Sequence, residues 1–222
     1  MIKKYKVFES HINKRKDIRR ILHLKGVDYT INDDFSVNII CKKYSHIDFR
    51  TDDIIGGQLP FKIKELTGEL RCIGTNLSDL SNMPDIVKSY ANSGGLILPS
   101  NNIKHIHNLS KNISGLIQLR NNLITDITVD EYNRISNYPG VSKLDRNPIQ
   151  TLINYLKRRF GTDSDVDIIE RLEEFEVIKD INKIDMLSFE KLFNFYNVDF
   201  KNVRSHLDAY INITENYDFI NE

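Results

Sequence analysis

The sequence is poor in cysteine, and this limits how the fold can be held together. Of 222 residues, only Cys41 and Cys72 are cysteines. Two thiols cannot form the disulfide framework of a small secreted domain, and they cannot supply a four-ligand zinc site by themselves. A chain of this length buries enough apolar surface to fold without such support. We therefore expect a protein of the cytoplasm, with no metal and no other cofactor.

Long apolar runs are also missing. No stretch approaches the roughly 18 residues that a helix needs to cross a bilayer. The basic N-terminus is not followed by the apolar segment and small-residue cleavage site of a secretory signal. Hydrophobic residues make up 40% of the chain and charged residues 28%, as in ordinary globular domains. The sequence therefore predicts neither membrane association nor export.

An excess of one charge is absent overall, because 31 basic residues balance 31 acidic ones. The distribution is uneven, however. Residues 1–26 carry nine basic and two acidic side chains, a net charge of +7, whereas residues 161–222 carry six and fifteen, a net charge of −9. This balance does not favour a nucleic-acid or membrane-surface binder as a whole, although the basic start can act locally.

What the sequence does contain is an internal repeat with the spacing LxLxxNxLxxL. Residues 96–106 and 117–127 fit it at every anchor. Residues 142–152 fit with one polar substitution, residues 70–80 fit with Thr in place of Asn, and residues 37–47 form a more degraded copy. Successive anchors lie 33, 26, 21 and 25 residues apart, mostly within the usual range of about 20–29. The anchors are Lys42, Thr75, Asn101, Asn122 and Asn147.

The pattern predicts a short strand followed by a turn. Leu96 and Leu98 alternate, so they point to one side of a strand and Ile97 to the other. Ile103 follows the turn and fills the same interior. The side chain of Asn101 lies at the turn, where it can satisfy backbone groups that the bend leaves without partners. Stacked copies bury the apolar side that one copy leaves open.

This pattern resembles the leucine-rich-repeat family, and more narrowly the short, degenerate leucine-rich-repeat-like proteins of large tailed bacteriophages. The stretch Tyr29–Asp34 is similar to the segment that opens their first repeat, and Gly68–Cys72 and Gly95–Leu98 look like their strands. The resemblance covers roughly residues 29–155 and departs from the family at Lys42, Thr75 and an insertion over residues 51–66. It implies an α/β solenoid of about five irregular repeats that binds other macromolecules and has no catalytic motif.

Both ends of the chain predict helical caps. In the first 25 residues, Ile12, Ile18, Ile21 and Leu22 share one side of a basic helix that stops at Gly26. Apolar residues recur at helical spacing over residues 151–160, 166–178, 187–196 and 199–212. We therefore expect a basic N-terminal helical cap over residues 1–26, a leucine-rich-repeat-like solenoid over 27–155 and an acidic helical C-terminal cap over 156–222.

Motifs for catalysis or metal binding are weak. The acids from Asp163 to Asp167, with Glu174, have the spacing of a calcium loop, but Ile168 stands where that loop needs Gly, so a helix N-cap is the better interpretation. Cys72 is expected in the core, and Cys41 has Lys42 and Lys43 beside it, which can lower its pKa. His105 and His107 lack a third ligand. We expect no enzyme.

The sequence also predicts an exposed surface that can bind a partner. Residues that flank the inward anchors should line the exposed sheet, with isoleucines towards its N-terminal half and charged residues towards its C-terminal half. The competing interpretation is that the N-terminal cap or the insertion covers those isoleucines. The residues expected to bind a partner are Asn38, Ile40, Glu69, Arg71, Ile73, Ile97, Gln118, Arg120 and Lys143.

These observations predict a non-enzymatic, phage-encoded module that docks on a host or viral protein through its concave sheet. The alternative is a nucleic-acid-associated protein, in which Arg15, Arg19 and Arg20 of the basic helix contact phosphates. A third hypothesis is head-to-tail self-association of the basic and acidic ends.

Overall fold

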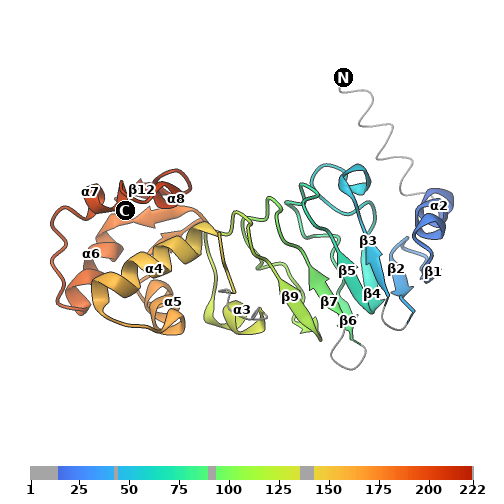
Figure 1. Cartoon of the computed structure of the whole chain (residues 1–222), viewed down its shortest axis with the longest axis horizontal. Helices are drawn as coiled ribbons and strands as arrows, with labels where there is room; N and C mark the ends of the chain where they lie inside the picture. Colours follow the sequence, from blue (N-terminus) through green and yellow to red (C-terminus); the bar gives the residue numbers. More distant parts are fainter. Residues whose placement is uncertain (1–14, 43–44, 90–93, 136–142, 222) are drawn as a thin grey trace, which may run out of the picture. The chain divides into compact units, whose positions relative to one another are not determined.

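The computed structural model describes residues 15–42, 45–89, 94–135 and 143–221. The chain has a mixed α/β fold with several sheets and many parallel strands (Figure 1). It divides into two compact units. Unit 1 comprises Met1–Asn102 and Asn108–Leu119, and unit 2 comprises Ile103–His107 and Arg120–Glu222.

Unit 1 contains two sheets. Sheet A has the order β1 (Asp28–Ile31), β2 (Val37–Ile40), β4 (Ile63–Thr67), β6 (Ile86–Lys88) and β8 (Asn112–Ile113), in which only the β1–β2 pair is antiparallel. Sheet B has the order β3 (His46–Asp48), β5 (Glu69–Arg71), β7 (Gly95–Ile97) and β9 (Leu116–Gln118), and all its pairs are parallel.

The core of unit 1 comes from the inward side chains of both sheets. Leu70, Leu96 and Ile117 are register partners in sheet B and are at most 3% exposed. Leu66 and Val87 are partners in sheet A and are equally buried. The chain passes from a strand of sheet A to the next strand of sheet B, so each pass adds one apolar layer to the core.

Glycines make the corners between the two sheets. Gly68, Gly94 and Gly115 come directly before β5, β7 and β9, with φ angles of 121°, 125° and 98°. A Cβ atom on Gly94 would lie 2.7 Å from the carbonyl oxygen of Gly68, and one on Gly115 would lie 2.5 Å from that of Gly94. Only glycine tolerates both this backbone conformation and this close stacking of one corner on the next.

Asn101 serves the backbone of its own turn and of the preceding one, as predicted. Its Oδ1 accepts hydrogen bonds from the amide and hydroxyl of Thr75 (2.9 and 3.0 Å) and from the amide of Leu77 (3.1 Å). Its Nδ2 donates to the carbonyl oxygens of Cys72, Leu98 and Pro99 at 2.6, 3.1 and 3.2 Å. The side chain is only 5% exposed, so it supplies partners that water does not.

The same side-chain role recurs within unit 2. The Oδ1 of Asn122 accepts from the amide of Ile103 (3.2 Å), and that of Asn147 accepts from the amide of Ile124 (3.1 Å). Both asparagines are buried.

A left-handed residue precedes each of these turn anchors. Gly74, Ser100, Asn121 and Arg146 have φ angles of 63°, 59°, 55° and 58°. Each stands one position before Thr75, Asn101, Asn122 or Asn147. The turns therefore share one backbone geometry although their sequences differ, and an arginine in this conformation is unusual for an L-residue.

The degraded copy predicted over residues 37–47 is wrong. Val37 and Ile39 lie on β2 in sheet A, whereas the strand that joins sheet B in this region is β3, at His46–Asp48. Alternating apolar residues identify a half-buried strand but do not say which of two sheets it joins. Lys42 is exposed, so its side chain does not take the buried position that Asn101 takes in its turn. Tyr44 lies outside the described residues.

The N-terminal helix is confirmed over the described residues. Helix α2 (Arg15–Lys25) buries Ile18 and Leu22 completely and contacts β1. Gly26 ends it in the left-handed conformation (φ 66°), and its amide bonds to the carbonyl oxygen of His23. The predicted Ile12 lies outside the described residues.

Unit 2 contains helices and one small sheet. The helices are α3 (Val129–Arg134), α4 (Pro148–Phe160), α5 (Asp165–Glu174), α6 (Met186–Phe195), α7 (Val203–Leu207) and α8 (Ile211–Thr214). The sheet has the order β10 (Ile178–Lys179), β11 (Lys183–Asp185) and β12 (Asp218–Ile220). The sequence did not predict this sheet, because the apolar residues of this region recur at helical spacing and Ile178 of β10 fell within a predicted helix.

The helices of unit 2 follow the predicted ranges with local differences. Predicted helix 166–178 ends at Glu174, where β10 follows, and range 199–212 holds α7 and part of α8. The predicted N-cap of α5 is confirmed, because the hydroxyl of Ser164 accepts a bond from the amide of Asp167. Leu144 is buried in a turn, and Ser142 lies outside the described residues. In the described part of the chain, no helix has the length and apolar character of a membrane span.

We expect Asn101→Ala to lower the free energy of unfolding by roughly 2–5 kcal/mol, because it leaves the buried amides of Thr75 and Leu77 without an acceptor. Urea unfolding followed by circular dichroism measures the change. The neighbouring Asn102 is exposed, so Asn102→Ala should stay within about 0.5 kcal/mol of the unmodified protein. Equal losses in the two variants would contradict this role of Asn101.

Candidate binding surface

The outward side chains of sheet B form two rows across its four strands. The first row is His46, Glu69, Gly95 and Leu116, and the second is Asp48, Arg71, Ile97 and Gln118. Because neighbouring parallel strands lie about 4.8 Å apart, side chains in one row are close enough to contact the same ligand. We call this set of residues, with Ile73 just beyond β5, the sheet B face.

The sheet B face combines charged side chains, mainly on β3 and β5, with apolar residues, mainly on β7 and β9. Ile73 is 53% exposed and Leu116 is 39% exposed. Arg71 and Glu69 form an ion pair within β5, and β7 separates this strand from Leu116 on β9. Apolar contacts supply affinity in a protein interface, and charged groups around them supply selectivity.

Ile97 contributes less to this face than the sequence predicts. It is only 8% exposed, although its neighbours in the row point outward. It lies in register between Arg71 and Gln118, whose longer side chains flank it. The predicted exposure of Ile97 is therefore wrong.

Asn38 and Ile40 do not lie on the sheet B face. Both are on β2 in sheet A, where the Nδ2 of Asn38 donates to the hydroxyl of Thr30 (3.2 Å) and Ile40 is 50% exposed. The prediction that they share one surface with Glu69 and Arg71 is wrong, because β2 pairs with β1 and β4 instead of β5.

Two other predicted partner-binding residues belong to unit 2. Arg120 is exposed just after β9. Lys143 is half-buried, donates to the carbonyl oxygen of Tyr132 (3.1 Å) and lies 4.5 Å from the centre of the Tyr132 ring. The structure thus brings together Glu69, Arg71, Ile73, Ile97 and Gln118 in unit 1 and places each of the other predicted residues elsewhere.

The basic residues predicted for nucleic-acid binding lie on α2. Arg19 and Arg20 are exposed, and within the described ranges neither has a carboxylate partner. Arg15 differs, because it forms an ion pair with Asp33 (3.1 Å) and donates to the carbonyl oxygen of Asn32 (3.2 Å). Leu24, near the end of the same helix, is 79% exposed.

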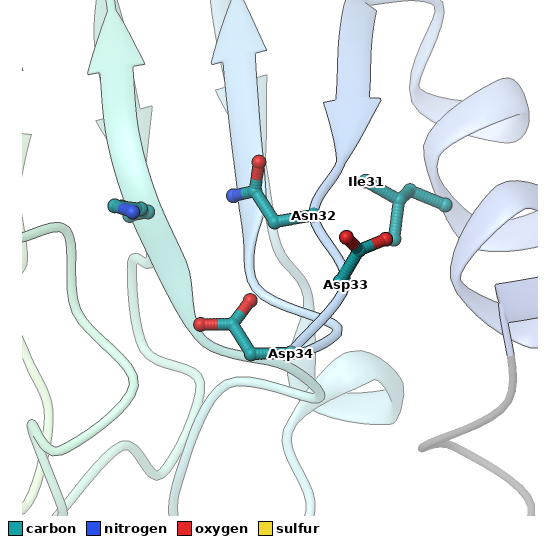
Figure 2. Close-up of a pocket in the computed structure, with 5 residues that line it drawn as sticks. Ile31, Asn32, Asp33 and Asp34 are labelled. Atoms are coloured by element: carbon teal, nitrogen blue, oxygen red, sulfur yellow. The ribbon is translucent and has the colours of Figure 1, made fainter.

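A pocket of about 540 Å³ lies at the turn between β1 and β2 (Figure 2). Ile31, Asn32, Asp33, Asp34 and Lys64 line it. Asp34 already accepts hydrogen bonds from the amide and hydroxyl of Ser36 (3.0 and 2.6 Å), and these bonds, with the charge of Lys64, lower its pKa. The polar groups that line the pocket are mainly engaged in bonds that stabilise the turn, so few of them are left to bind a ligand.

Both cysteines are structural. Cys72 is fully buried, as predicted, and burial raises the pKa of its thiol strongly. Cys41 is also fully buried, and burial raises its pKa too, so the expected lowering by Lys42 is wrong. A buried neutral thiol is a poor nucleophile and a poor metal ligand.

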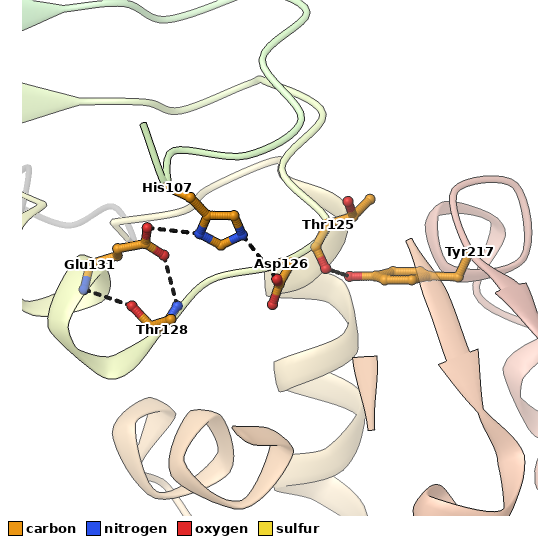
Figure 3. Close-up of polar contacts among 6 residues, drawn as sticks. All are labelled: His107, Thr125, Asp126, Thr128, Glu131 and Tyr217. Carbon is orange, nitrogen blue, oxygen red and sulfur yellow. Dashed lines mark hydrogen bonds and ion pairs between the residues drawn. The ribbon is translucent and has the colours of Figure 1, made fainter. Parts of the chain in front are cut away.

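His107 has partners that the sequence did not predict. Its Nδ1 lies 2.9 Å from an oxygen of Glu131, and its Nε2 lies 3.1 Å from an oxygen of Asp126 (Figure 3). The other oxygen of Glu131 accepts the amide of Thr128 in the capping box of α3. Sequence reasoning can find this Thr-x-x-Glu box, but it cannot find the histidine that joins it 24 residues away.

This cluster is a poor metal site. The two carboxylates lie at opposite nitrogens of one ring, so they cannot both bind an ion that the ring also binds. Across the described residues, no group of three or more His, Cys, Asp or Glu side chains has the arrangement to hold a metal. The acids from Asp163 to Glu174 lie before and within α5 and do not form a calcium loop.

We expect neither Cys41 nor Cys72 to react with a thiol reagent in the folded protein at pH 7.5, since both are buried in the protonated form. Both should react after denaturation in guanidinium chloride. Thiol quantification with and without denaturant measures this, and rapid labelling of Cys41 in the folded protein would show that it is accessible.

Comparison with known proteins adds no relative: no family model, no curated protein and no solved structure matches this chain.

Proposed function

We propose that the chain is a non-enzymatic interaction module that docks on a partner protein through the sheet B face. The observation that carries the proposal is the exposure of Ile73 (53%), just beyond β5, and of Leu116 (39%), on β9, on the same sheet as the Arg71–Glu69 ion pair of β5. An open sheet face of this composition suits a protein surface, because it combines apolar area with directional polar groups.

We further propose that the fold is a leucine-rich-repeat-like solenoid. Three features support this: the parallel registers of sheet B, the stacked glycine corners and the asparagines that bond back to the preceding turn. On this proposal residues 1–26 and 156–222 cap the solenoid of residues 27–155. The resemblance to leucine-rich-repeat-like phage proteins favours a phage-encoded protein that acts in the cytoplasm of the host cell.

The side-chain chemistry supports a non-enzymatic role. The thiols of Cys41 and Cys72 are buried and protonated, so neither serves as a nucleophile. Both ring nitrogens of His107 face carboxylates, so this imidazole is not free to take a proton from a substrate.

The second candidate function is binding of nucleic acid through α2. Arg19 and Arg20 favour it, because they are exposed on a helix that carries five basic side chains and one acidic side chain. Phosphate contacts would give affinity without base specificity. The sheet B face remains the leading candidate, because it offers exposed apolar side chains that a partner can bury, as well as charged groups.

Ile73→Asp should weaken binding of a captured partner protein about 30-fold or more, since a charge in the centre of an apolar contact costs roughly 2 kcal/mol or more. Ile40→Asp is the matched control. Ile40 is equally exposed (50% against 53%) but lies on sheet A. The measurement is affinity capture followed by titration of the purified pair, with circular dichroism to show that both variants fold. Equal binding by both variants would move the interface away from the sheet B face.

For the second candidate, Arg19→Glu with Arg20→Glu should abolish binding to single- and double-stranded nucleic acid measured by fluorescence anisotropy. In the unmodified protein, the logarithm of the affinity should fall with the logarithm of salt concentration by about 0.9 for each phosphate contacted on duplex DNA. An affinity that does not change with salt concentration, or no binding at all, would contradict this function.

A further inference from the structure

The two nitrogens of the His107 ring face two different carboxylates at hydrogen-bond distance (Figure 3). A neutral imidazole carries one N–H group, so it can donate to only one of them. The imidazolium ion carries two and can donate to both. We propose that His107 is a proton-operated clamp in unit 2, which holds the segment 103–107 to the segment 125–131 when the ring is protonated and releases it when the ring loses a proton.

The clamp joins parts of unit 2 that are distant in sequence. Asp126 precedes α3, and Glu131 lies in its first turn. Backbone hydrogen bonds already link the two segments at Ile103 with Leu123 and at Lys104 with Thr125. His107 lies beyond the last of these bonds, so its side chain closes the end of the contact.

Glu131 makes the clamp part of the helix start. Its side chain is almost fully buried, and its second oxygen accepts the amide of Thr128 at 2.9 Å. The hydroxyl of Thr128 in turn accepts the amide of Glu131 at 3.2 Å. The neutral ring keeps one N–H group, so loss of a proton from His107 leaves either Glu131 or Asp126 facing a nitrogen lone pair and weakens the contact between His107 and the start of α3.

The groups around the clamp are mainly acidic. Asp126 and Glu131 contact His107 directly, and Asp130 and Glu173 add negative charge from α3 and α5. The ring of His105 stacks on His107 with centroids 5.5 Å apart. Tyr217 lies on the other side of Asp126, and its hydroxyl donates to the carbonyl oxygen of Thr125 at 2.5 Å. His107 supplies the positive charge that this arrangement needs.

The electrostatics agree with the geometry. Burial works to lower the pKa of His107, but the hydrogen bonds and charges of Glu131 and Asp126 outweigh burial and raise it above the ordinary value. A raised histidine pKa stabilises the folded state fully below about pH 6.5, and this stabilisation is lost as pH rises through the folded-state pKa. Over that interval, the unfolding equilibrium constant should rise about tenfold per pH unit.

The neighbouring carboxyl groups determine how stability depends on pH in the acidic range. Burial raises the pKa of Asp126 and of Glu173, so protonation of these groups favours the folded state and stability again falls as pH rises. Asp165 acts in the opposite direction. Despite burial, hydrogen bonds from Lys157, Gln150 and Tyr132 lower its pKa, so its contribution is lost as pH falls below about 4. We therefore expect maximal stability of unit 2 at mildly acidic pH.

The test uses the full chain. The pH titration of each histidine is followed by NMR, and urea unfolding is measured from pH 5 to pH 9. We expect His107 to titrate above pH 6.5 and to carry protons on both nitrogens at pH 6. Hydrogen exchange of the α3 amides should accelerate as His107 loses its proton.

Variants separate the clamp from general effects of pH. Asp126→Asn removes one charge from the less buried partner and should lower the pKa of His107. His107→Gln should remove the alkaline loss of stability, whereas His206→Gln, at an exposed position of α7, should leave it unchanged. Titration of His107 at or below pH 6.5, an Asp126→Asn variant with unchanged His107 titration, or an unchanged alkaline loss in His107→Gln would each overturn the proposal.

Discussion

The structure of this chain depends on finding partners for backbone groups that its turns bury. The turns after β5 and β7 leave amides and carbonyls inside the protein, where an unpaired group costs about 1–3 kcal/mol. Asn101 meets this requirement with one side chain, because three donors surround its Oδ1 and three carbonyl oxygens share the two N–H groups of its Nδ2. Thr75 is the partner of Asn101 in the preceding turn, because its amide and its hydroxyl both donate hydrogen bonds to the Oδ1 of Asn101.

Once the turns are satisfied, the glycine corners determine how tightly the strands of unit 1 stack. The carbonyl oxygen of Gly68 accepts the amide of Gly95, and that of Gly94 accepts the amide of Leu116, both at 3.0 Å. A side chain at these corners would separate the strands and break the register of sheet B. The same register places Arg71 beside Ile97 and Glu69 beside Gly95 on the sheet B face. The arrangement of side chains on the sheet B face is thus a consequence of the corners and turns behind it.

Unit 2 adds clusters of charged hydrogen bonds to the neutral hydrogen bonds of Asn122 and Asn147. His107 lies between two acids, and Asp165 between Lys157, Gln150 and Tyr132. Hydrogen bonds to charged groups are stronger than neutral ones, but they hold only while each group keeps its charge. The stability of unit 2 should accordingly depend on pH.

The sequence by itself determined the strand and turn pattern around Asn101 and Asn122, the buried Cys72, the amphipathic helix before Gly26 and the N-cap at Ser164, because each depends on residues close together in the chain. Around Asn147 it predicted a strand where the structure has a turn that leads into α4. Only the tertiary structure decided which sheet each strand joined. Val37 and Ile39 alternate as sheet B strands do, yet β2 pairs with β1 and β4, so Ile40 is separated from Ile73. It also decided that His107 meets Asp126 and Glu131, 19 and 24 residues away, because local patterns of polarity do not encode which side chains meet after the chain folds.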